Sequence, residues 1–436
     1  MQENIAAIST ANGTGGVAII RISGASSLEI AKKMFTPSGG NIDYIPNYMY
    51  PGKIEGDGFY DYGFAVYFKA PKSFTGEDIV EFHCHGGVRI ARGILKKALS
   101  LGARAAERGE FTKRAFLNGK LSLASAEGMI DMINAESLAL VRAGSMMYSE
   151  KLTAEVKNIQ NSLKDILAQV AVEIDYPEED EAGVDLAKTA KDINELNNQI
   201  TRLIGTYSGG KKIKSGVTVA ICGKPNTGKS SLLNALLGYD KAIVSDEAGT
   251  TRDAVEGEIE LFGVKYNLID TAGIRERAGT VESIGIERAK TAMLSADIVL
   301  AVTDEQGAAH LPQKPNGEVI KVFNKCDLCA PRGEYDIAVS AKTGEGLESL
   351  KQLIAQKGGA GEAASDKAYI VEERHYSALQ RAAQALNEAA VNVSSLTLDL
   401  IAVDLKEAWE ALGEITGETA SEEIISTVFE KFCVGK

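Results

Sequence analysis

The stretch at 223–230, with the sequence GKPNTGKS, constrains the fold of this chain more than any other. It has the form G-x-x-x-x-G-K-S, in which backbone N–H groups cradle phosphate oxygens at the start of a helix. Residues 217–222 before it are mostly apolar or β-branched and predict a buried strand, and residues 231–237 after it carry helix formers. This context predicts a nucleotide-binding α/β domain. Lys229 then reaches the β- and γ-phosphates, and the Ser230 hydroxyl ligates Mg²⁺.

Two further predicted strands end in side chains that suit a nucleotide. The strand at 264–269 is followed by D-T-A-G, where Asp270 holds Mg²⁺ through water and the Gly273 N–H meets the γ-phosphate. The apolar run at 319–323 is followed by N-K-C-D. The Asp of an N-K-x-D motif accepts two N–H bonds from the edge of guanine, which adenine cannot supply. The sequence therefore predicts a GTPase.

Two short segments complete the predicted GTP site. V-S-A-K at 339–342 resembles the loop that closes over guanine, and G-T-T-R-D at 249–253 offers Thr251 as the switch residue that completes the Mg²⁺ shell. The GTP-binding residues predicted in these motifs are Asn226, Thr227, Gly228, Lys229, Ser230, Ser231, Thr251, Asp270, Thr271, Ala272, Gly273, Asn324, Lys325, Asp327, Ser340, Ala341 and Lys342.

One position departs from Ras-like GTPases, in which a Gln follows D-x-x-G and orients the attacking water. Here that position is Ile274, which neither donates nor accepts a hydrogen bond. Glu282, Arg252 and Arg275 are the nearest candidates in sequence to supply the missing function. We expect Lys229, Thr251 and Glu282 to be the catalytic residues.

Composition narrows the function classes. The chain has 436 residues, which favours about two to four domains, and its net charge of −13 predicts no general affinity for nucleic acid. Any action on RNA therefore needs a local patch or a partner. Lys211, Lys212 and Lys214 form a small basic cluster that we interpret as a solvated linker. No apolar run is long enough to span a membrane, and five scattered cysteines fit a reducing, cytoplasmic location.

The regions outside the GTPase segment have different patterns. Strands are predicted at 17–22, 62–67 and 79–85, and amphipathic helices at 152–170 and 186–207, with helical pattern again from 366 to 432. Glu81, His83 and His85 would share one face of a strand. This arrangement favours a half-exposed strand whose Glu binds a neutral or cationic group, with a metal site as the alternative. The pair Cys326 and Cys329 is interpreted as a coincidence, because no second pair exists.

Four features together resemble one family: SFTGEDIVEFHCHGG at 73–87, GEFTKRAFLNGKL at 109–121, the GTPase motifs, and FCVGK at 432–436. The chain is similar in these features to the MnmE (TrmE) family of tRNA-modifying GTPases, among the TrmE-Era-EngA-YihA-Septin-like GTPases. The resemblance implies an α/β folate-binding and dimerisation domain at 1–118 and a helical bundle domain built from 119–212 and 366–436. It also implies an inserted Ras-like P-loop GTPase (G) domain at 213–357.

The resemblance also implies partners and cofactors. Members act as homodimers with the FAD-containing partner MnmG (GidA), and install an aminomethyl or carboxymethylaminomethyl group at carbon 5 of the wobble uridine of tRNA. The carbon comes from a tetrahydrofolate derivative, 5-formyl- or 5,10-methylene-tetrahydrofolate. GTP hydrolysis uses Mg²⁺ and K⁺ and is coupled to pairing of the G domains.

Site residues carried over by the resemblance fall into two groups. The folate site would use Arg21, Glu81, Lys120 and Lys436, and Cys433 is a candidate reactive thiol whose role stays open. Potassium would be held by Asn226, Ser245, Glu247 and Thr250, of which Ser245 and Thr250 also join the GTP site, while Glu282 positions the water.

Two other function classes share the GTPase motifs. A ribosome-assembly GTPase is disfavoured by the negative net charge and by the absence of a basic C-terminal tail in this sequence. A folate-dependent one-carbon transferase that uses GTP only for regulation would show the same G-domain motifs. The four features favour tRNA modification.

Overall fold

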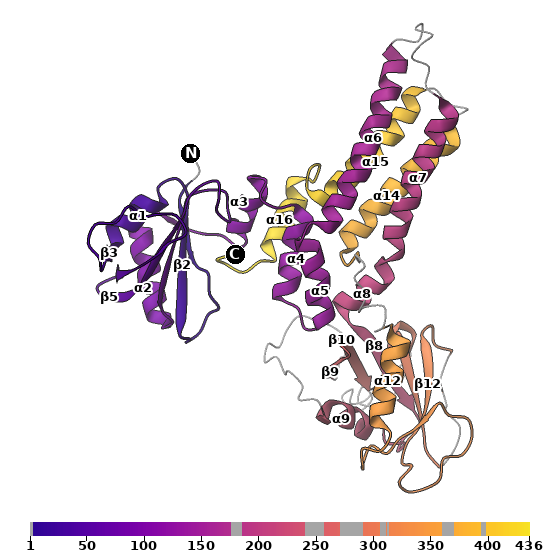
Figure 1. Cartoon of the computed structure of the whole chain (residues 1–436). Helices are drawn as coiled ribbons and strands as arrows, with labels where there is room; N and C mark the ends of the chain where they lie inside the picture. Colours follow the sequence, from indigo (N-terminus) through magenta and orange to yellow (C-terminus); the bar gives the residue numbers. More distant parts are fainter. Residues whose placement is uncertain are drawn as a thin grey trace, which may run out of the picture. The chain divides into compact units, whose positions relative to one another are not determined.

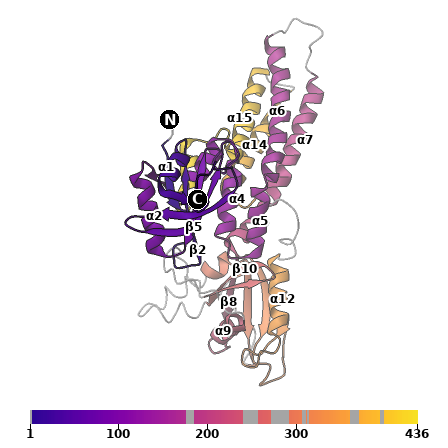
Figure 2. The same ribbon diagram turned by 60° about the vertical axis from the view of Figure 1, so that its left-hand side comes forward.

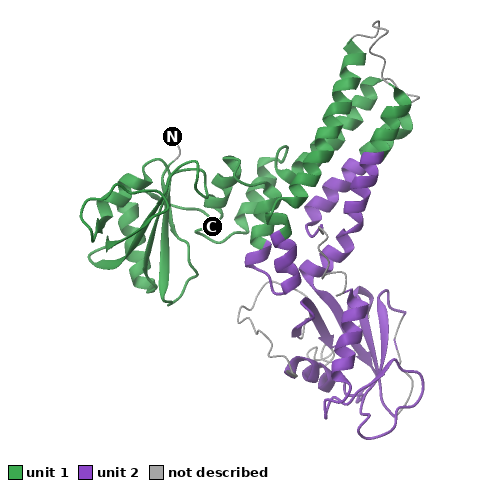
Figure 3. Cartoon of the chain, in the orientation of Figure 1, with its two compact units in different colours: residues 1–130, 146–194, 384–436 green, residues 131–145, 195–383 purple. Residues whose placement is uncertain are grey.

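A computed structural model describes residues 3–175, 185–239, 257–270, 291–305, 311, 314–359, 370–393 and 398–436. Two compact units make up the chain (Figure 3): residues 1–130, 146–194 and 384–436 form unit 1, and residues 131–145 and 195–383 form unit 2. Within the described ranges, none of the helices combines the length and apolar character that crossing a membrane requires.

The N-terminal part of unit 1 is a seven-stranded sheet with the order β3-β4-β5-β6-β2-β1-β7. Its strands are β1 (Ile5–Ile8), β2 (Val17–Ser23), β3 (Phe35–Pro37), β4 (Met49–Glu55), β5 (Tyr60–Phe68), β6 (Ile79–His85) and β7 (Arg104–Ala105). Neighbouring strands run antiparallel except β1 and β7, which are parallel. The three strands predicted here are confirmed as β2, β5 and β6.

Two helices, α1 (Ser27–Met34) and α2 (Val88–Ser100), build the core of this sheet. Ile20 and Ile22 on β2 and Phe82 on β6 are buried in that core. Because side chains alternate along a strand, Arg21 and Glu81 point to the opposite face. That face presents the polar side chains that the sequence singled out.

The helical part is assembled from both ends of the chain. Its helices are α3 (Glu110–Leu117), α4 (Leu123–Ile133), α5 (Leu138–Tyr148), α6 (Lys151–Asp175), α7 (Leu186–Gly205), α8 (Tyr207–Ser215), α14 (Glu373–Asn392), α15 (Leu398–Thr416) and α16 (Glu422–Glu430). In unit 1, α6 and α15 lie side by side in both views (Figure 1, Figure 2), and Gln160 Nε2 donates a 3.2 Å hydrogen bond to the Trp409 carbonyl. The apolar stripe of α6 from Leu152 to Val170 is buried, as predicted. Within unit 1, helices from two separate segments of the chain thus pack against each other.

Between these two segments lies a six-stranded sheet with the order β13-β12-β11-β8-β10-β9. Its strands are β8 (Val217–Gly223), β9 (Gly257–Leu261), β10 (Val264–Asp270), β11 (Ile298–Thr303), β12 (Glu318–Phe323) and β13 (Ile337–Ala338), with helices α9 (Lys229–Tyr239) and α12 (Leu347–Gly358). Only β9 runs antiparallel to its neighbour. The carboxyl ends of the parallel strands therefore meet at one edge, where open α/β sheets bind ligands. This confirms the predicted inserted P-loop domain.

The interpretation of Lys211, Lys212 and Lys214 as a linker is wrong, although Lys211 is exposed to solvent as predicted. All three lie in α8, and Lys214 Nζ donates a 2.9 Å hydrogen bond to Asp131 and pairs with Glu372. The helix continues to Ser215, one residue before Gly216 leads into β8. Helical geometry turns Lys214 toward two carboxylates, so its charge is paired within unit 2.

Candidate functional sites

The loop at 223–230 has its shape fixed by local backbone conformation and one buried lysine. Asn226 and Gly228 have positive φ values of 65° and 86°. A Cβ at Gly228 would collide with Nδ2 of Asn324, so only glycine fits this close approach. Lys229 is 7% exposed, and its Nζ donates a 2.8 Å hydrogen bond to the Lys224 carbonyl. The ammonium group thus lies inside the loop that would wrap phosphates.

The residues expected to hold Mg²⁺ meet directly. Ser230 Oγ donates a 2.6 Å hydrogen bond to Oδ2 of Asp270, whose side chain is buried at the end of β10. A hydroxyl oxygen beside a carboxylate is the kind of oxygen donor set that Mg²⁺ takes in phosphate sites. The described part of the predicted Mg²⁺ site fits the ion.

The base-binding loops are tied to the phosphate loop by Asn324. Its Nδ2 donates a 2.9 Å hydrogen bond to the Thr227 carbonyl, and its Oδ1 accepts a 3.2 Å bond from the Ala341 N–H. Ser340 Oγ donates a 2.6 Å hydrogen bond to Oδ1 of Asp327. The carboxylate that would read guanine is therefore oriented by the loop that closes over the base. Among the other predicted residues, Ser231 on α9 and Lys342 are exposed.

Sequence reasoning missed Asp304, which follows β11 at the same sheet edge. Its Oδ2 lies 2.7 Å from Lys325 Nζ, which also donates a 2.6 Å hydrogen bond to the Asn226 carbonyl. An acidic residue directly after the apolar run 298–303 was the signal that could have identified it, because carboxyl ends of parallel strands share one edge.

Several predicted residues lie outside the part of the chain that the structure describes. They are Ser245, Glu247, Thr250, Thr251, Thr271, Ala272, Gly273 and Glu282. Of the predicted potassium ligands, Asn226 is described, and its side chain is exposed at the phosphate loop. An exposed amide oxygen at this place fits a cation ligand.

On the open face of the N-terminal sheet, Arg21 and Glu81 lie directly opposite each other on β2 and β6. Arg21 Nε is 2.7 Å from Glu81 Oε1, and the guanidinium lies 5.6 Å from the ring centres of both Phe74 and Phe111. Burial alone would raise the pKa of Glu81, but the hydrogen bond from His83 and the charge of Arg21 outweigh it and lower that pKa. The result is an ionised carboxylate beside a cation and two aromatic rings.

The metal alternative for β6 is not supported. His83 Nε2 lies 3.3 Å from Glu81 Oε2, whereas His85 pairs with Asp61 at 2.7 Å. Among the residues described, no group of three or more His, Cys, Asp or Glu side chains could hold a metal ion. The strand is half-exposed, and the cationic group that Glu81 binds is Arg21.

The C-terminal tail reaches this face through main-chain contacts. The Phe111 N–H donates a 3.2 Å hydrogen bond to the Lys436 carbonyl, and Val434 pairs with Arg108 in an antiparallel bridge. Cys433 is exposed. Phe111 thus touches both Arg21 and the chain end, which brings three of the predicted folate residues near one another.

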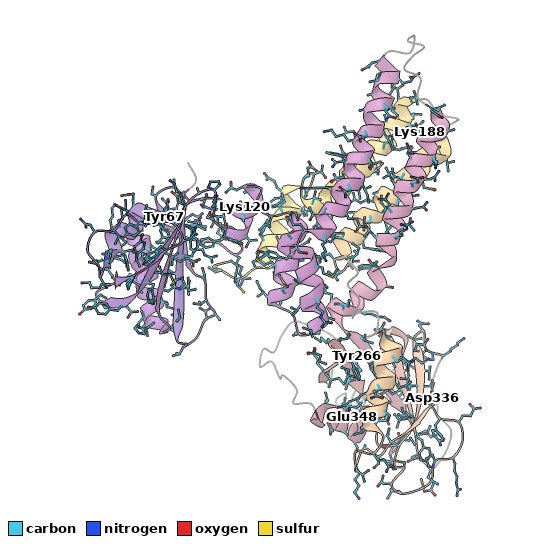
Figure 4. The ribbon with its side chains drawn as sticks, in the orientation of Figure 1. Tyr67, Lys120, Lys188, Tyr266, Asp336 and Glu348 are labelled. Carbon is cyan, nitrogen blue, oxygen red and sulfur yellow. The ribbon has the colours of Figure 1, made fainter. Side chains whose placement is uncertain are left out.

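The fourth predicted folate residue, Lys120, lies just after α3 (Figure 4). Its Nζ donates a 3.0 Å hydrogen bond to the Pro71 carbonyl, at the start of the loop that carries Phe74. The contact holds Lys120 against that loop.

Residues 217–358 form a P-loop GTPase domain. Three features define it: the strand order, the phosphate loop after β8, and the N-K-x-D carboxylate that accepts a hydrogen bond from Ser340. Residues 123–433 match the model of the MnmE helical domain, and residues 4–120 match that of the GTP-binding protein TrmE N-terminus. The chain belongs to the MnmE family of tRNA modification GTPases.

The similarity to known proteins extends over the whole length of this chain. The tRNA modification GTPase MnmE of Natranaerobius thermophilus is 38% identical over 456 residues, and that of Carboxydothermus hydrogenoformans is 38% identical over 464 residues. Each alignment covers 100% of both proteins. Among solved structures, the G domain of the T. maritima FeoB iron transporter is 29% identical and covers 34% of this chain and 99% of its own, with a TM-score of 0.23.

Proposed function

We propose that this chain is the GTP-hydrolysing component of a complex that modifies carbon 5 of the wobble uridine of tRNA. In this proposal it works in the cytoplasm as a homodimer with the FAD-containing partner MnmG, and a tetrahydrofolate derivative supplies the carbon. The proposed division is a folate-binding and dimerisation domain at 1–118, a helical domain at 119–212 and 366–436, and a G domain at 213–357. Full-length similarity to proteins named tRNA modification GTPases supports it.

The observation that carries the proposal is that one chain combines the GTPase-motif contact of Ser340 with Asp327 and a separate Arg21–Glu81 pair beside aromatic rings. Glu81 can accept N–H bonds from a pterin ring, and Arg21 and Lys436 can meet carboxylates or ring oxygens. Phe74, which is half-buried, offers a ring on which a flat heterocycle can pack, whereas Phe111 is fully buried beneath Arg21 and supports the site from within. These groups fit a folate, although Arg21 and Glu81 already bind each other and must share or exchange that contact with the ligand.

For GTP hydrolysis, the proposal gives each residue of this chain a separate task. Lys229 holds the β- and γ-phosphates, and Asp327 holds the guanine edge. Ser230 and Thr251 would ligate Mg²⁺, with Asp270 acting through water, and the bound ion would neutralise charge on the phosphate oxygens. Asn226, with Ser245, Glu247 and Thr250, holds K⁺ at the place of an arginine finger, and Glu282 positions the water.

The experiment that tests the proposal is the nucleoside profile of tRNA from a strain that lacks the gene. We expect the modified wobble uridine to disappear, to return with the wild-type gene, and to stay absent with Lys229→Ala. An unchanged wobble uridine in the deletion strain would contradict tRNA modification. Unchanged tRNA together with an altered ratio of ribosomal subunits would instead favour a ribosome-assembly GTPase.

A further inference from the structure

We propose that Asp304 is a positioning residue for guanine nucleotides: its carboxylate holds Lys325 across the phosphate loop and so sets nucleotide affinity. The inference deepens the GTPase function and rests on it. Asp304 belongs to none of the GTPase motifs, and its role follows from three observations made at one sheet edge.

The first observation is that the Lys325 ammonium donates two hydrogen bonds. Nζ lies 2.7 Å from Asp304 Oδ2 and 2.6 Å from the main-chain oxygen of Asn226. The Asp304 side chain is 10% exposed and the Lys325 side chain is 35% exposed, so the carboxylate is largely shielded from solvent while the ammonium is partly open to it. Charge-assisted hydrogen bonds are shorter and stronger than neutral ones, and the 2.7 Å contact with the Asp304 carboxylate has the length of such a bond.

The second observation is the place of Asp304 in the sheet. It follows β11, the strand between β8, which leads into the phosphate loop, and β12, which leads into N-K-x-D. Val302 pairs with Gly223 and Thr303 pairs with Phe323. A side chain directly after Thr303 therefore stands between the two loops that have to close on opposite parts of one nucleotide.

The third observation is the backbone of the two residues that the ammonium joins. Asn226 and Lys325 both have a φ of 65°, in the left-handed region that side-chain-bearing residues rarely adopt. Such conformations persist where surrounding contacts hold them. The Asp304–Lys325–Asn226 bridge supplies a contact at both strained positions, so loss of the carboxylate should loosen both loops together.

Asp304 contacts Lys325 and not the nucleotide. Its loss should therefore affect nucleotide binding more than the chemical step. Loosened loops weaken binding of GDP and GTP alike, because both nucleotides use the base loop and the phosphate loop. The effect should appear as a higher Kd and a higher KM, with a smaller change in kcat.

The test compares Asp304→Asn with Glu334→Gln in the full chain. Glu334 pairs with Lys321 at the same 2.7 Å, but its side chain is 89% exposed. The measurements are the Kd of a fluorescent GDP analogue and the KM and kcat for GTP. We expect Asp304→Asn to weaken binding about tenfold, the scale of one hydrogen bond to a charged group, while Glu334→Gln matches the wild type. Asp304→Glu should recover part of the affinity.

Wild-type affinity in Asp304→Asn would overturn the inference and leave the GTPase function intact, and a lowered Tm with unchanged Kd would assign Asp304 to the fold alone. Failure of the wild type itself to bind the GDP analogue would overturn both.

Discussion

Lys214 Nζ donates a 2.9 Å hydrogen bond to Oδ1 of Asp131, 83 residues earlier in the chain, and the same ammonium pairs with Glu372. Both acidic residues are buried, whereas the Lys214 side chain is 35% exposed, so two buried carboxyl groups share one partly exposed cation. Burial and the charge of Glu372 raise the pKa of Asp131 to about 7, against the opposing effect of Lys214. The cluster joins α4, α8 and the residue before α14, where the chain enters and leaves the G domain.

The raised pKa predicts how stability depends on pH. A carboxyl group that binds its proton more tightly when folded stabilises the fold fully below its unfolded pKa of about 3.9, and this stability is lost as pH rises through about 7. We therefore expect the Tm of the wild type to fall more between pH 5 and 8 than that of Asp131→Asn. Thermal unfolding followed by circular dichroism measures it.

The control for this prediction is Asp57→Asn, which removes an exposed carboxylate paired with Lys96 in unit 1. Its Tm should follow the wild-type pH dependence. Parallel curves for Asp131→Asn and the wild type would contradict a titrating Asp131.

Asp327 should determine which base is bound. Asp327→Asn cannot accept both guanine N–H bonds, so GTP binding should weaken by roughly 10²-fold or more, since each hydrogen bond to a charged group is worth about 1.5–3 kcal/mol. Xanthine presents a carbonyl in place of the guanine amino group, so Asp327→Asn should bind XTP more tightly than the wild type does. Competition of GTP and XTP against a fluorescent nucleotide measures both changes.

Ser340→Ala is the matched variant for base selection. It keeps the carboxylate and removes the 2.6 Å hydrogen bond that orients it, together with the 3.1 Å hydrogen bond that Ser340 Oγ accepts from the Thr343 N–H. It should weaken GTP binding without any gain for XTP. A gain for XTP in Ser340→Ala would show that base choice does not depend on the Asp327 carboxylate.

The phosphate loop should tolerate no side chain at Gly228. In Gly228→Ala the backbone is strained by the positive φ of 86°, and the new Cβ collides with the Asn324 amide, so nucleotide binding should be lost. Gly238 lies near the end of α9, the helix that begins directly after Gly228, and a Cβ added there would meet open space. Gly238→Ala should therefore retain binding and stabilise the helix by roughly 0.5–1 kcal/mol. Equal affinities for the two variants in calorimetric titration with GDP would exclude the close packing described here.

Glu81 should contribute to folate affinity through its charge. Glu81→Gln keeps the shape of the side chain and removes the charge that holds Arg21 and His83, so affinity for 5-formyltetrahydrofolate should fall about tenfold. Because the pKa of Glu81 is lowered, the carboxylate stays ionised throughout the neutral and mildly acidic range, and wild-type affinity should not weaken from its protonation there. Equilibrium dialysis measures this affinity, with Asp57→Asn as the control; wild-type affinity in Glu81→Gln would remove this residue from the site.

Sequence patterns predicted the parts of this molecule that depend on neighbouring residues. The strand before Gly223, the turn at Gly228 and the carboxylates at strand ends follow from local periodicity and from motif spacing. The role of Lys214 was missed because its partners are distant in sequence. Glu372 lies 158 residues from Lys214, and neither residue carries a local signal of this pairing. Asp304 carried a local signal, its place after the apolar run 298–303, but its partner Lys325 lies in a separate motif.

The most direct test of the proposed mechanism is GTP turnover in KCl against NaCl at equal ionic strength, with Asn226→Ala and Asn226→Gly beside the wild type. Glycine tolerates the φ of 65° at this position, so the pair separates loss of the amide from backbone strain. We predict strong stimulation by K⁺ in the wild type and none in either variant. Equal rates in both salts for the wild type, or K⁺ stimulation that survives in Asn226→Gly, would contradict a potassium ion held by Asn226.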